Sequence, residues 1–173
     1  VQPAGYYDHG DVLGTLGGVV PQNDFFGGIV ITSDAHGYEY NFCEQLPASI
    51  KGRVHLTLDG DCTYEPGDPP LAGVTIYLLD AQGNRIGQTV TDANGEYQFT
   101  NLVPGTYGVE EAQPSGYFDG GEEAGSVGGT VTNDKITAIV LGSGVNAVEY
   151  NFCEIPPASL AGKVYVDHNN NGQ

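Results

Sequence analysis

The sequence predicts an all-β fold built as a two-sheet sandwich, and three observations lead to this prediction. Glycine accounts for 27 of 173 residues, and valine, isoleucine, threonine and tyrosine are common, a composition typical of short strands joined by many turns. Uninterrupted runs of the strong helix formers are absent. Seven short segments with strand character follow one another within one unit, as they do in a sandwich.

Five strands are expected in the first half of this unit. The first two place alternate apolar side chains on one face. A turn at Gly83 precedes the third strand, Asn94-Gly95 precedes the fourth, and Pro104-Gly105 precedes the fifth; these are turn-forming residues, and Asn-Gly is the strongest tight-turn pair in the chain. The expected ranges are residues 49–56, 72–79, 85–91, 96–99 and 106–111.

The second half of the unit is less regular. Residues 120–130 are rich in glycine and acidic residues, so we expect a long surface loop there. A sixth strand is expected over residues 135–141. The seventh, over residues 145–152, places Tyr150 and Phe152 on one face.

The chain repeats itself at a spacing of 110 residues. The segment YNFCEQLPAS at residues 40–49 returns as YNFCEIPPAS at residues 150–159, with eight of ten positions identical. Upstream, GYYD at residues 5–8 corresponds to GYFD at residues 116–119, at a shift of 111. A unit of this length is a domain rather than one turn of a solenoid.

We therefore expect a slice of a tandem array. Residues 1–46 are the C-terminal half of one repeat, residues 47–155 are a complete repeat, and residues 156–173 are a linker and the first strand of a following repeat. The complete repeat is long enough to bury its own core. Pro156 and Pro157 make the linker semi-rigid, so neighbouring repeats are expected to keep a roughly fixed orientation.

The chain is strongly acidic, with 22 carboxylates against five basic residues and a formal net charge of −17. This balance argues against a nucleic-acid partner and against binding to anionic membranes, because both need Lys and Arg. No run of about 18 apolar residues occurs, so no membrane span is expected. The acidity either serves solubility alone or includes carboxylates that hold cations.

One acidic segment has the spacing of a calcium loop. Residues 57–68 read TLDGDCTYEPGD, with oxygen-bearing side chains at positions 1, 3, 5, 7, 9 and 12. EF-hand loops place their ligands in this way, and carboxylates packed so closely repel one another unless a cation is bound. A solvated acidic turn is the alternative. The candidate Ca2+ ligands are Asp59, Asp61, Thr63, Glu65 and Asp68.

The second copy of the loop fills the same template in a complementary way. Asp167, Asn169 and Asn171 occupy positions 1, 3 and 5, and Gly172 occupies position 6, where EF-hand loops carry glycine. These three oxygen-bearing residues are further candidate Ca2+ ligands. The first copy lacks the acid at position 1 and has Cys62 in place of glycine, which predicts weak affinity.

Several linked motifs of the unit resemble the B-type repeats of serine–aspartate-repeat surface adhesins, a likeness that spans nearly the whole unit. The segments are GRV at 52–54, DGD at 59–61, GD at 67–68, LAGVTIYLLD at 71–80, TDANGEYQF at 91–99 and LVPGTY at 102–107.

This resemblance implies an immunoglobulin-like or prealbumin-like β-sandwich in tandem repeats, rigidified by calcium. It also implies a spacer role in a cell-surface or secreted protein, with neighbouring repeats or adjacent subunits as partners. In this chain the family's calcium loop falls on Asp59, Asp61, Glu65 and Asp68.

Three cysteines are present, and we expect neither a Cys43–Cys153 bond nor a Cys43–Cys62 bond within the chain. Cys43 and Cys153 lie one repeat apart, whereas a disulfide needs Cα atoms within roughly 7 Å. The intervening strand would carry Cys62 roughly 20 Å away from Cys43 at about 3.3 Å per residue. Packed, unpaired residues are expected, with bonds between chains as the alternative.

The leading functional hypothesis is a non-enzymatic structural repeat of an extracellular fibre, stalk or adhesin, stiffened by calcium in the loop after the first strand. No nucleophile elbow, phosphate loop or histidine metal spacing occurs. The alternative is a module that binds a carbohydrate or a protein at the cell surface through exposed tyrosines. Exposed rings would favour this alternative, and buried rings would favour the spacer. The tyrosines are Tyr6, Tyr7, Tyr38 and Tyr117.

Overall fold

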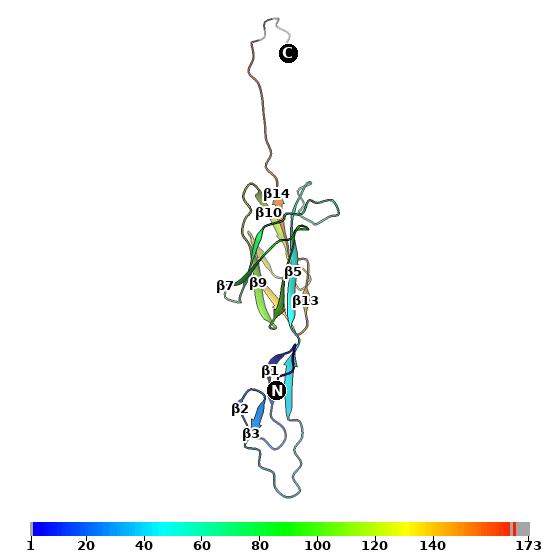
Figure 1. Cartoon of the computed structure of the whole chain (residues 1–173), viewed down its shortest axis with the longest axis vertical. Helices are drawn as coiled ribbons and strands as arrows, with labels where there is room; N and C mark the ends of the chain where they lie inside the picture. The colour runs from blue at the N-terminus through cyan, green and yellow to red at the C-terminus, as the bar shows by residue number, and fades with distance from the viewer. Residues whose placement is uncertain (1, 167, 169–173) are drawn as a thin grey trace.

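The computed structural model describes residues 2–166 and 168, and the described chain is all-β (Figure 1). No helix that is long and apolar enough to cross a membrane occurs among these residues. The strands in chain order are β1 (Tyr7–Val12), β2 (Val19–Gln22), β3 (Phe25–Gly27), β4 (Asn41–Gln45), β5 (Ala48–Leu56), β6 (Thr75–Leu79), β7 (Arg85–Val90), β8 (Glu96–Leu102), β9 (Gly105–Glu111), β10 (Phe118–Glu123), β11 (Thr130–Thr132), β12 (Lys135–Leu141), β13 (Asn146–Ala147) and β14 (Asn151–Ile155).

Strands β5 to β14 form a sandwich of two five-stranded sheets, which confirms the predicted fold class. In one sheet β5 pairs with β8 along one edge and with β13 and then β14 along the other, and β10 pairs with β14. The other sheet has the order β11-β12-β9-β6-β7. Alternate side chains of facing strands fill the core, as the strand period requires. The largest fully buried apolar side chains include Ile50, Ile76, Ile136, Tyr150 and Phe152.

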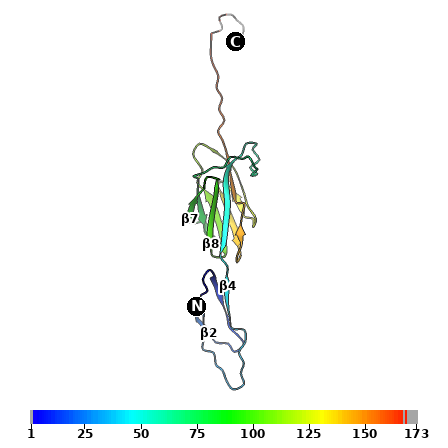
Figure 2. The same cartoon turned by 45° about the vertical axis from the view of Figure 1, so that its right-hand side comes forward.

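The first and last strands of the sandwich are parallel neighbours. Strand β14 pairs with β5 in parallel, with Phe152 opposite Val54 and Cys153 opposite His55. The chain therefore enters the sandwich at one end, through β5, and leaves it at the other, through β14 (Figures 1 and 2). Residues 156–166 continue beyond β14 as an extended segment.

Two predictions for the second half of the unit were wrong. The predicted seventh strand is interrupted, because Glu149 takes a left-handed backbone conformation with φ 65° that a strand cannot contain, so β13 and β14 are separate. The predicted loop over residues 120–130 begins instead with β10. That strand is held by backbone pairing to β14 around a bulge between Asp119 and Gly121, so it carries no apolar alternation.

Near the N-terminus, strands β1 and β4 reproduce the pairing of β10 and β14. Asp8 pairs with Glu44 just as Asp119 pairs with Glu154, and each ladder has a bulge at the next position. Large apolar side chains are exposed on this part, among them Phe25 and Phe42. The assignment of chain segments to one complete and two partial repeats stays a prediction.

Gly52 lies at the most crowded point of β5. A Cβ atom there would overlap the carbonyl oxygen of Tyr150, which also accepts a hydrogen bond from the Tyr97 hydroxyl at 2.7 Å. No larger residue fits unless β5 and the segment before β14 separate.

We expect Gly52→Ala to lower the free energy of unfolding by about 2–3 kcal/mol, since it overpacks a filled site. Gly87→Ala in β7 is the control, because its Cβ would lie 3.7 Å from the nearest atom. That change should be neutral or stabilising by about 0.5 kcal/mol. Urea unfolding of both variants measures the difference, and equal stabilities would contradict the packing argument.

Candidate functional site

The predicted calcium loop connects β5 to β6 at the end of the sandwich where the chain leaves (Figure 1). Its carboxylates accept hydrogen bonds from its own backbone: Asp61 from the Thr63 N–H and Asp68 from the Glu65 N–H, each at 2.9 Å. The Thr57 hydroxyl donates to Asp59 at 3.1 Å. Such local bonds fix a tight, coiled turn.

Cys62 takes the backbone conformation that glycine supplies in an EF-hand loop. It stands at position 6, where the chain must turn sharply, and its φ is 57°. A left-handed conformation costs a non-glycine residue about 1–2 kcal/mol. The loop therefore keeps the turn of the template although it lacks the glycine.

The loop carboxylates are not gathered around one point. The side chains of Asp59, Asp61 and Glu65 are exposed, and that of Asp68 is half-buried. Within the described chain, the groups of three acids with oxygen atoms within 4.8 Å of one another lie elsewhere. Calcium binding by this loop stays a prediction. The candidates of the second copy, Asp167, Asn169 and Asn171, lie outside the described residues.

A disulfide joins Cys62 to Cys153, with Cα atoms 5.4 Å apart. The expectation that Cys153 is a packed, unpaired residue was therefore wrong. The sequence argument considered only pairs that include Cys43, whereas the return of β14 alongside β5 carries Cys153 to the loop that follows β5. Cys43, at the matching place in β4, is free.

An aromatic and cationic stack holds the loop against the sandwich. The side chain of His55 is fully buried, and its Nδ1 lies 3.5 Å from an Asp68 oxygen. Tyr64 packs edge-on to His55, and the Arg53 guanidinium lies 3.7 Å from the Tyr64 ring centroid, within cation–π range. Burial lowers the pKa of His55, and the opposing charge of Asp68 does not reverse this, so the imidazole is neutral at pH 7.

A second, more compact set of acids lies on the other side of β14. It combines residues at the end of β9, in β10, in the turn between β11 and β12, and in β14. Two groups, each with its oxygen atoms mutually within 4.8 Å, share Asp134. One group adds Glu111 and Glu154, and the other adds Asp119 and Glu122. These five acids are called the Asp134 cluster below.

Burial sets the protonation of this cluster. Glu111 and Glu154 are 4% and 0% exposed. Burial, followed by the charge of Glu154, raises the pKa of Glu111 to about 10. Burial also raises the pKa of Glu154 to about 7, against a hydrogen bond from Gln113 that lowers it. Without a cation, the cluster therefore retains protons that exposed carboxyls would lose.

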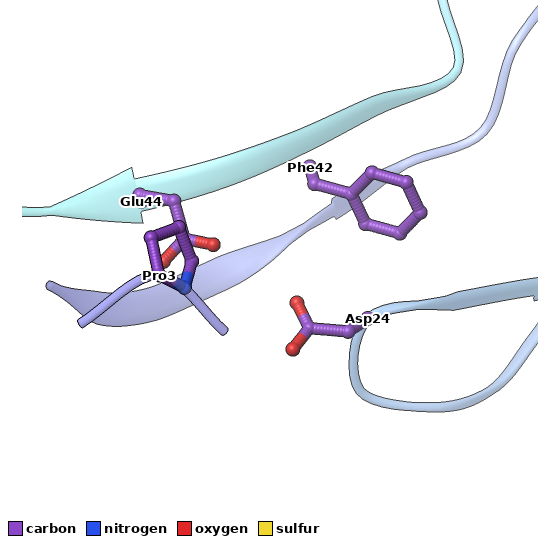
Figure 3. Close-up of a pocket in the computed structure, with 4 residues that line it drawn as sticks. All are labelled: Pro3, Asp24, Phe42 and Glu44. Atoms are coloured by element: carbon purple, nitrogen blue, oxygen red, sulfur yellow. The ribbon is translucent and has the colours of Figure 1, made fainter. Parts of the chain in front are cut away.

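The Asp134 cluster has a counterpart near the N-terminus, around Asp24. Asp8, Asp11 and Asp24 occupy the places of Asp119, Glu122 and Asp134, and their oxygens also lie within 4.8 Å of one another. Asp24 borders a cavity of about 270 Å³ that Pro3, Phe42 and Glu44 also line. Figure 3 shows the carboxylates of Asp24 and Glu44 pointing into this cavity.

The acids of the Asp134 cluster follow no spacing template in the sequence that would predict a cation site. Glu111 and Glu154 lie 43 positions apart in sequence, so no short motif connects them. The available signal was the repeat itself, which places carboxylates at equivalent positions in two regions of similar sequence.

The tyrosines proposed for ligand binding do not share one environment. Tyr6 and Tyr38 are 45% and 62% exposed. Tyr7 and Tyr117 are half-buried, and the Tyr7 hydroxyl donates to the carbonyl of Asn101 at 2.6 Å. Mixed exposure of this kind does not favour the ligand-binding alternative over the spacer.

Residues 48–148 match the SdrD B-like domain. The chain belongs to the SdrD B-like domain family. This confirms the predicted resemblance to B-type repeats. Serine-aspartate repeat-containing protein C of Staphylococcus aureus strain N315 is 32% identical over 114 residues, and so is the protein from strain Newman. Each alignment covers 65% of this chain and 12% of the relative, so the chain spans about an eighth of these relatives.

The chain also aligns with solved structures of pilins. The minor pilin GBS52 of Streptococcus agalactiae aligns with a TM-score of 0.43 and 18% identity, covering 69% of this chain and 49% of the pilin. The major pilin BcpA of Bacillus cereus aligns with a TM-score of 0.40 and 16% identity, covering 62% of this chain and 28% of the pilin. Family membership supports the expectation of a structural, non-enzymatic repeat.

We expect the double substitution of Cys62 and Cys153 by Ala to lower the free energy of unfolding by about 2–5 kcal/mol, because the bond closes a long loop in the unfolded chain. Reduction of the unaltered chain should have the same effect. Cys43→Ala is the control and should leave stability nearly unchanged. Equal urea midpoints for the oxidised chain and the double variant would contradict a stabilising bond.

In chelator, stability should fall as the pH rises from about 5 to 8. In the unfolded chain, Glu111 and Glu154 have the ordinary pKa of a glutamate. In the folded chain, the pKa of Glu111 is raised to about 10 and the pKa of Glu154 to about 7. The folded state thus holds more protons in this window, and rising pH favours unfolding. The charges of Asp134 and Asp119 face the same cluster and contribute to raising the pKa of Glu111.

A variant with Glu111→Gln and Glu154→Gln should show a shallower dependence of melting temperature on pH. Glu149→Gln, at an exposed position, is the control and should keep the original slope. The same slope in all three proteins would mean that general charge repulsion, rather than the cluster, sets the pH dependence.

Proposed function

We propose that this chain is a non-enzymatic, tension-bearing spacer of an extracellular or cell-surface fibre, stalk or adhesin. The observation that carries the proposal is the Cys62–Cys153 bond between the loop after the entry strand and the exit strand. Disulfides persist in oxidising compartments outside the cytosol, which supports the location. The partners would be neighbouring repeats of the same chain or adjacent subunits.

The arrangement suits a load along the chain. Tension enters at the start of β5 and leaves at the end of β14, at opposite ends of the sandwich (Figure 2). Two parallel neighbours pulled in this way slide past each other, so their hydrogen bonds are loaded together rather than one at a time. The disulfide then carries the load from Cys62 to Cys153 through a covalent bond.

Calcium in the loop over residues 57–68 would reinforce the same junction. The alternating oxygen donors suit a hard divalent cation, and the left-handed Cys62 gives the turn that such a loop requires. The hydrogen bond from the Thr57 N–H to the Glu154 carbonyl at 3.0 Å joins the start of the loop to β14. An ion held there would stiffen the loop and stabilise the folded state by mass action.

Force spectroscopy on the 173-residue chain, held at its two ends, tests the tension-bearing role. The oxidised repeat should release little length, because the 91-residue interval between the two cysteines is bypassed. Reduction should add roughly 300 Å to the release, at about 3.3–3.6 Å per residue.

Cys43→Ala is the control for this measurement and should behave like the original chain in both redox states. The tension-bearing proposal fails if oxidised and reduced chains release the same length.

Calcium binding by the loop is tested separately. Adding millimolar calcium should raise the melting temperature, and Asp59→Asn with Asp61→Asn should remove part of that rise by deleting two loop ligands. Glu39→Gln with Glu149→Gln removes the same charge at exposed positions and should not. If the loop variant keeps the whole calcium effect, the loop is not a calcium site.

A further inference from the structure

Strand β4 has a neighbour on only one of its two edges. Among the described residues it pairs with β1 alone, whereas β14, at the matching place 110 residues later, pairs with β10 on one side and with β5 on the other. Burial reflects this difference, since Phe152 in β14 is 1% exposed and Phe42 in β4 is 49% exposed. The open edge of β4 is therefore a template to which a further strand can pair.

The surroundings of β4 already have the geometry that β5 meets in the sandwich. The Tyr40 hydroxyl donates to the Gly17 carbonyl at 2.9 Å, as the Tyr150 hydroxyl donates to the Gly128 carbonyl at 2.9 Å. The bulge in the ladder of β1 and β4 repeats the bulge in the ladder of β10 and β14. A strand added to β4 would thus meet an ordered surface, which lowers the entropic cost of association.

The segment that follows β14 has a sequence similar to that of β5. Residues 158–166, called the C-terminal segment below, read ASLAGKVYV, and β5 reads ASIKGRVHL. Four of the nine positions are identical, and three others exchange similar side chains. Gly162 corresponds to Gly52, the residue at which β5 leaves room for the carbonyl of Tyr150. The C-terminal segment therefore has the residues that β5 needs to lie beside β14.

The apolar side chains of the C-terminal segment are exposed. Leu160 and Val164 are 101% and 104% exposed, whereas Ile50 and Val54, at the matching places in β5, are fully buried. The two side chains of β5 reach the core together because alternate residues of a strand lie on one face. The C-terminal segment thus carries the same apolar face without a core to cover it.

β4 and the C-terminal segment lie at opposite ends of the molecule. The strands β1 to β4 lie below the sandwich in the view of Figure 1, and the C-terminal segment extends away from its top; Figure 2 shows the same separation. The C-terminal segment is therefore placed to reach the open edge of β4 on a second copy rather than on its own. A head-to-tail contact of this kind does not close on itself, so it builds open rows of subunits.

We propose that the C-terminal segment of one copy adds as a strand to the open edge of β4 in a second copy. It would run parallel to β4 in the register of β5 and β14, with Val164 opposite Phe42 and Tyr165 opposite Cys43. Strand addition gains affinity from backbone hydrogen bonds and specificity from alternate side chains. The inference deepens the proposed function, on which its meaning for a fibre rests, by naming the adjacent subunit and its contact.

Polar groups and charge match this pairing. The Arg53 N–H donates to Oδ1 of Asn151 at 3.2 Å, and Lys163 and Asn41 stand at the two matching places. Residues 1–45 contain six acids and neither lysine nor arginine, whereas the C-terminal segment contains one lysine and no acid. Opposite charges steer two such surfaces together and disfavour the pairing of two acidic ends.

Sedimentation velocity of the 173-residue chain over a range of concentrations tests the proposal. The oligomers should lengthen as the concentration rises, because each added copy leaves one segment and one β4 edge open. Leu160→Asp places a charge on the face to be buried and should weaken association at least about tenfold. Ala161→Asp is the charge-matched control and should associate as the original chain does, because Ala161 matches the partly exposed Lys51. Both substituted positions are exposed, so neither change threatens the fold.

A disulfide trap tests the register. Gly172 lies outside the described residues, 110 positions after Cys62, so the proposed pairing would bring position 172 close to Cys43 of the second copy, as Cys62 lies close to Cys153. After mild oxidation of a Gly172→Cys variant, peptide mass spectrometry should find a bond between Cys43 and the introduced residue. Adding Leu160→Asp to this variant should remove most of that bond.

Three results would overturn the proposal. A chain that stays monomeric to about 1 mM would mean that another occupant covers β4. Equal association of the original chain and both Asp variants would place the contact elsewhere, and an equal loss in both would contradict a strand that buries one face. Each of these results would leave the force measurement on a single chain, and with it the tension-bearing role, unaffected. Absence of the trapped bond would overturn the parallel register.

Discussion

The parallel contact between β5 and β14 is the constraint on which the rest of the structure depends. It brings the last strand of the repeat into the sheet beside the first, with Phe152 opposite Val54 in the core. The same contact brings Cys153 to the loop after β5 and places the Glu154 side chain on the opposite flank, among the acids around Asp134. Packing, covalent linkage and charge thus meet on one five-residue strand.

The few basic residues of the chain pair with partly exposed glutamates rather than with the buried acids. Four of the five basic residues serve two glutamates, Glu96 and Glu110. Such partly exposed ion pairs contribute little each. The buried acids are left to be neutralised by protons or by cations. Their charge therefore depends on the surrounding solution rather than on another side chain.

Most of the strands could be predicted from local periodicity in the sequence. The features that the sequence did not predict depend on pairing between segments that are distant in sequence. The ranges 49–56 and 135–141 agree closely with β5 and β12, since alternating burial marks a strand in its own sequence. β10 has no such alternation, because its bulged backbone is held by β14. The disulfide and the Asp134 cluster likewise join segments that only the folded topology makes neighbours, and no local motif identifies them. A calcium loop over residues 57–68 could be predicted from the sequence because an EF-hand loop carries all its ligands in one short segment.

The bond between Cys62 and Cys153 also alters the consequence of proteolytic cleavage of the chain. Most of the polypeptide of the repeat lies between these two residues, including surface turns that proteases reach most easily. A single cut in that interval leaves both fragments covalently attached, so the chain stays in one piece. The protein could in this way lose a peptide bond without losing either fragment.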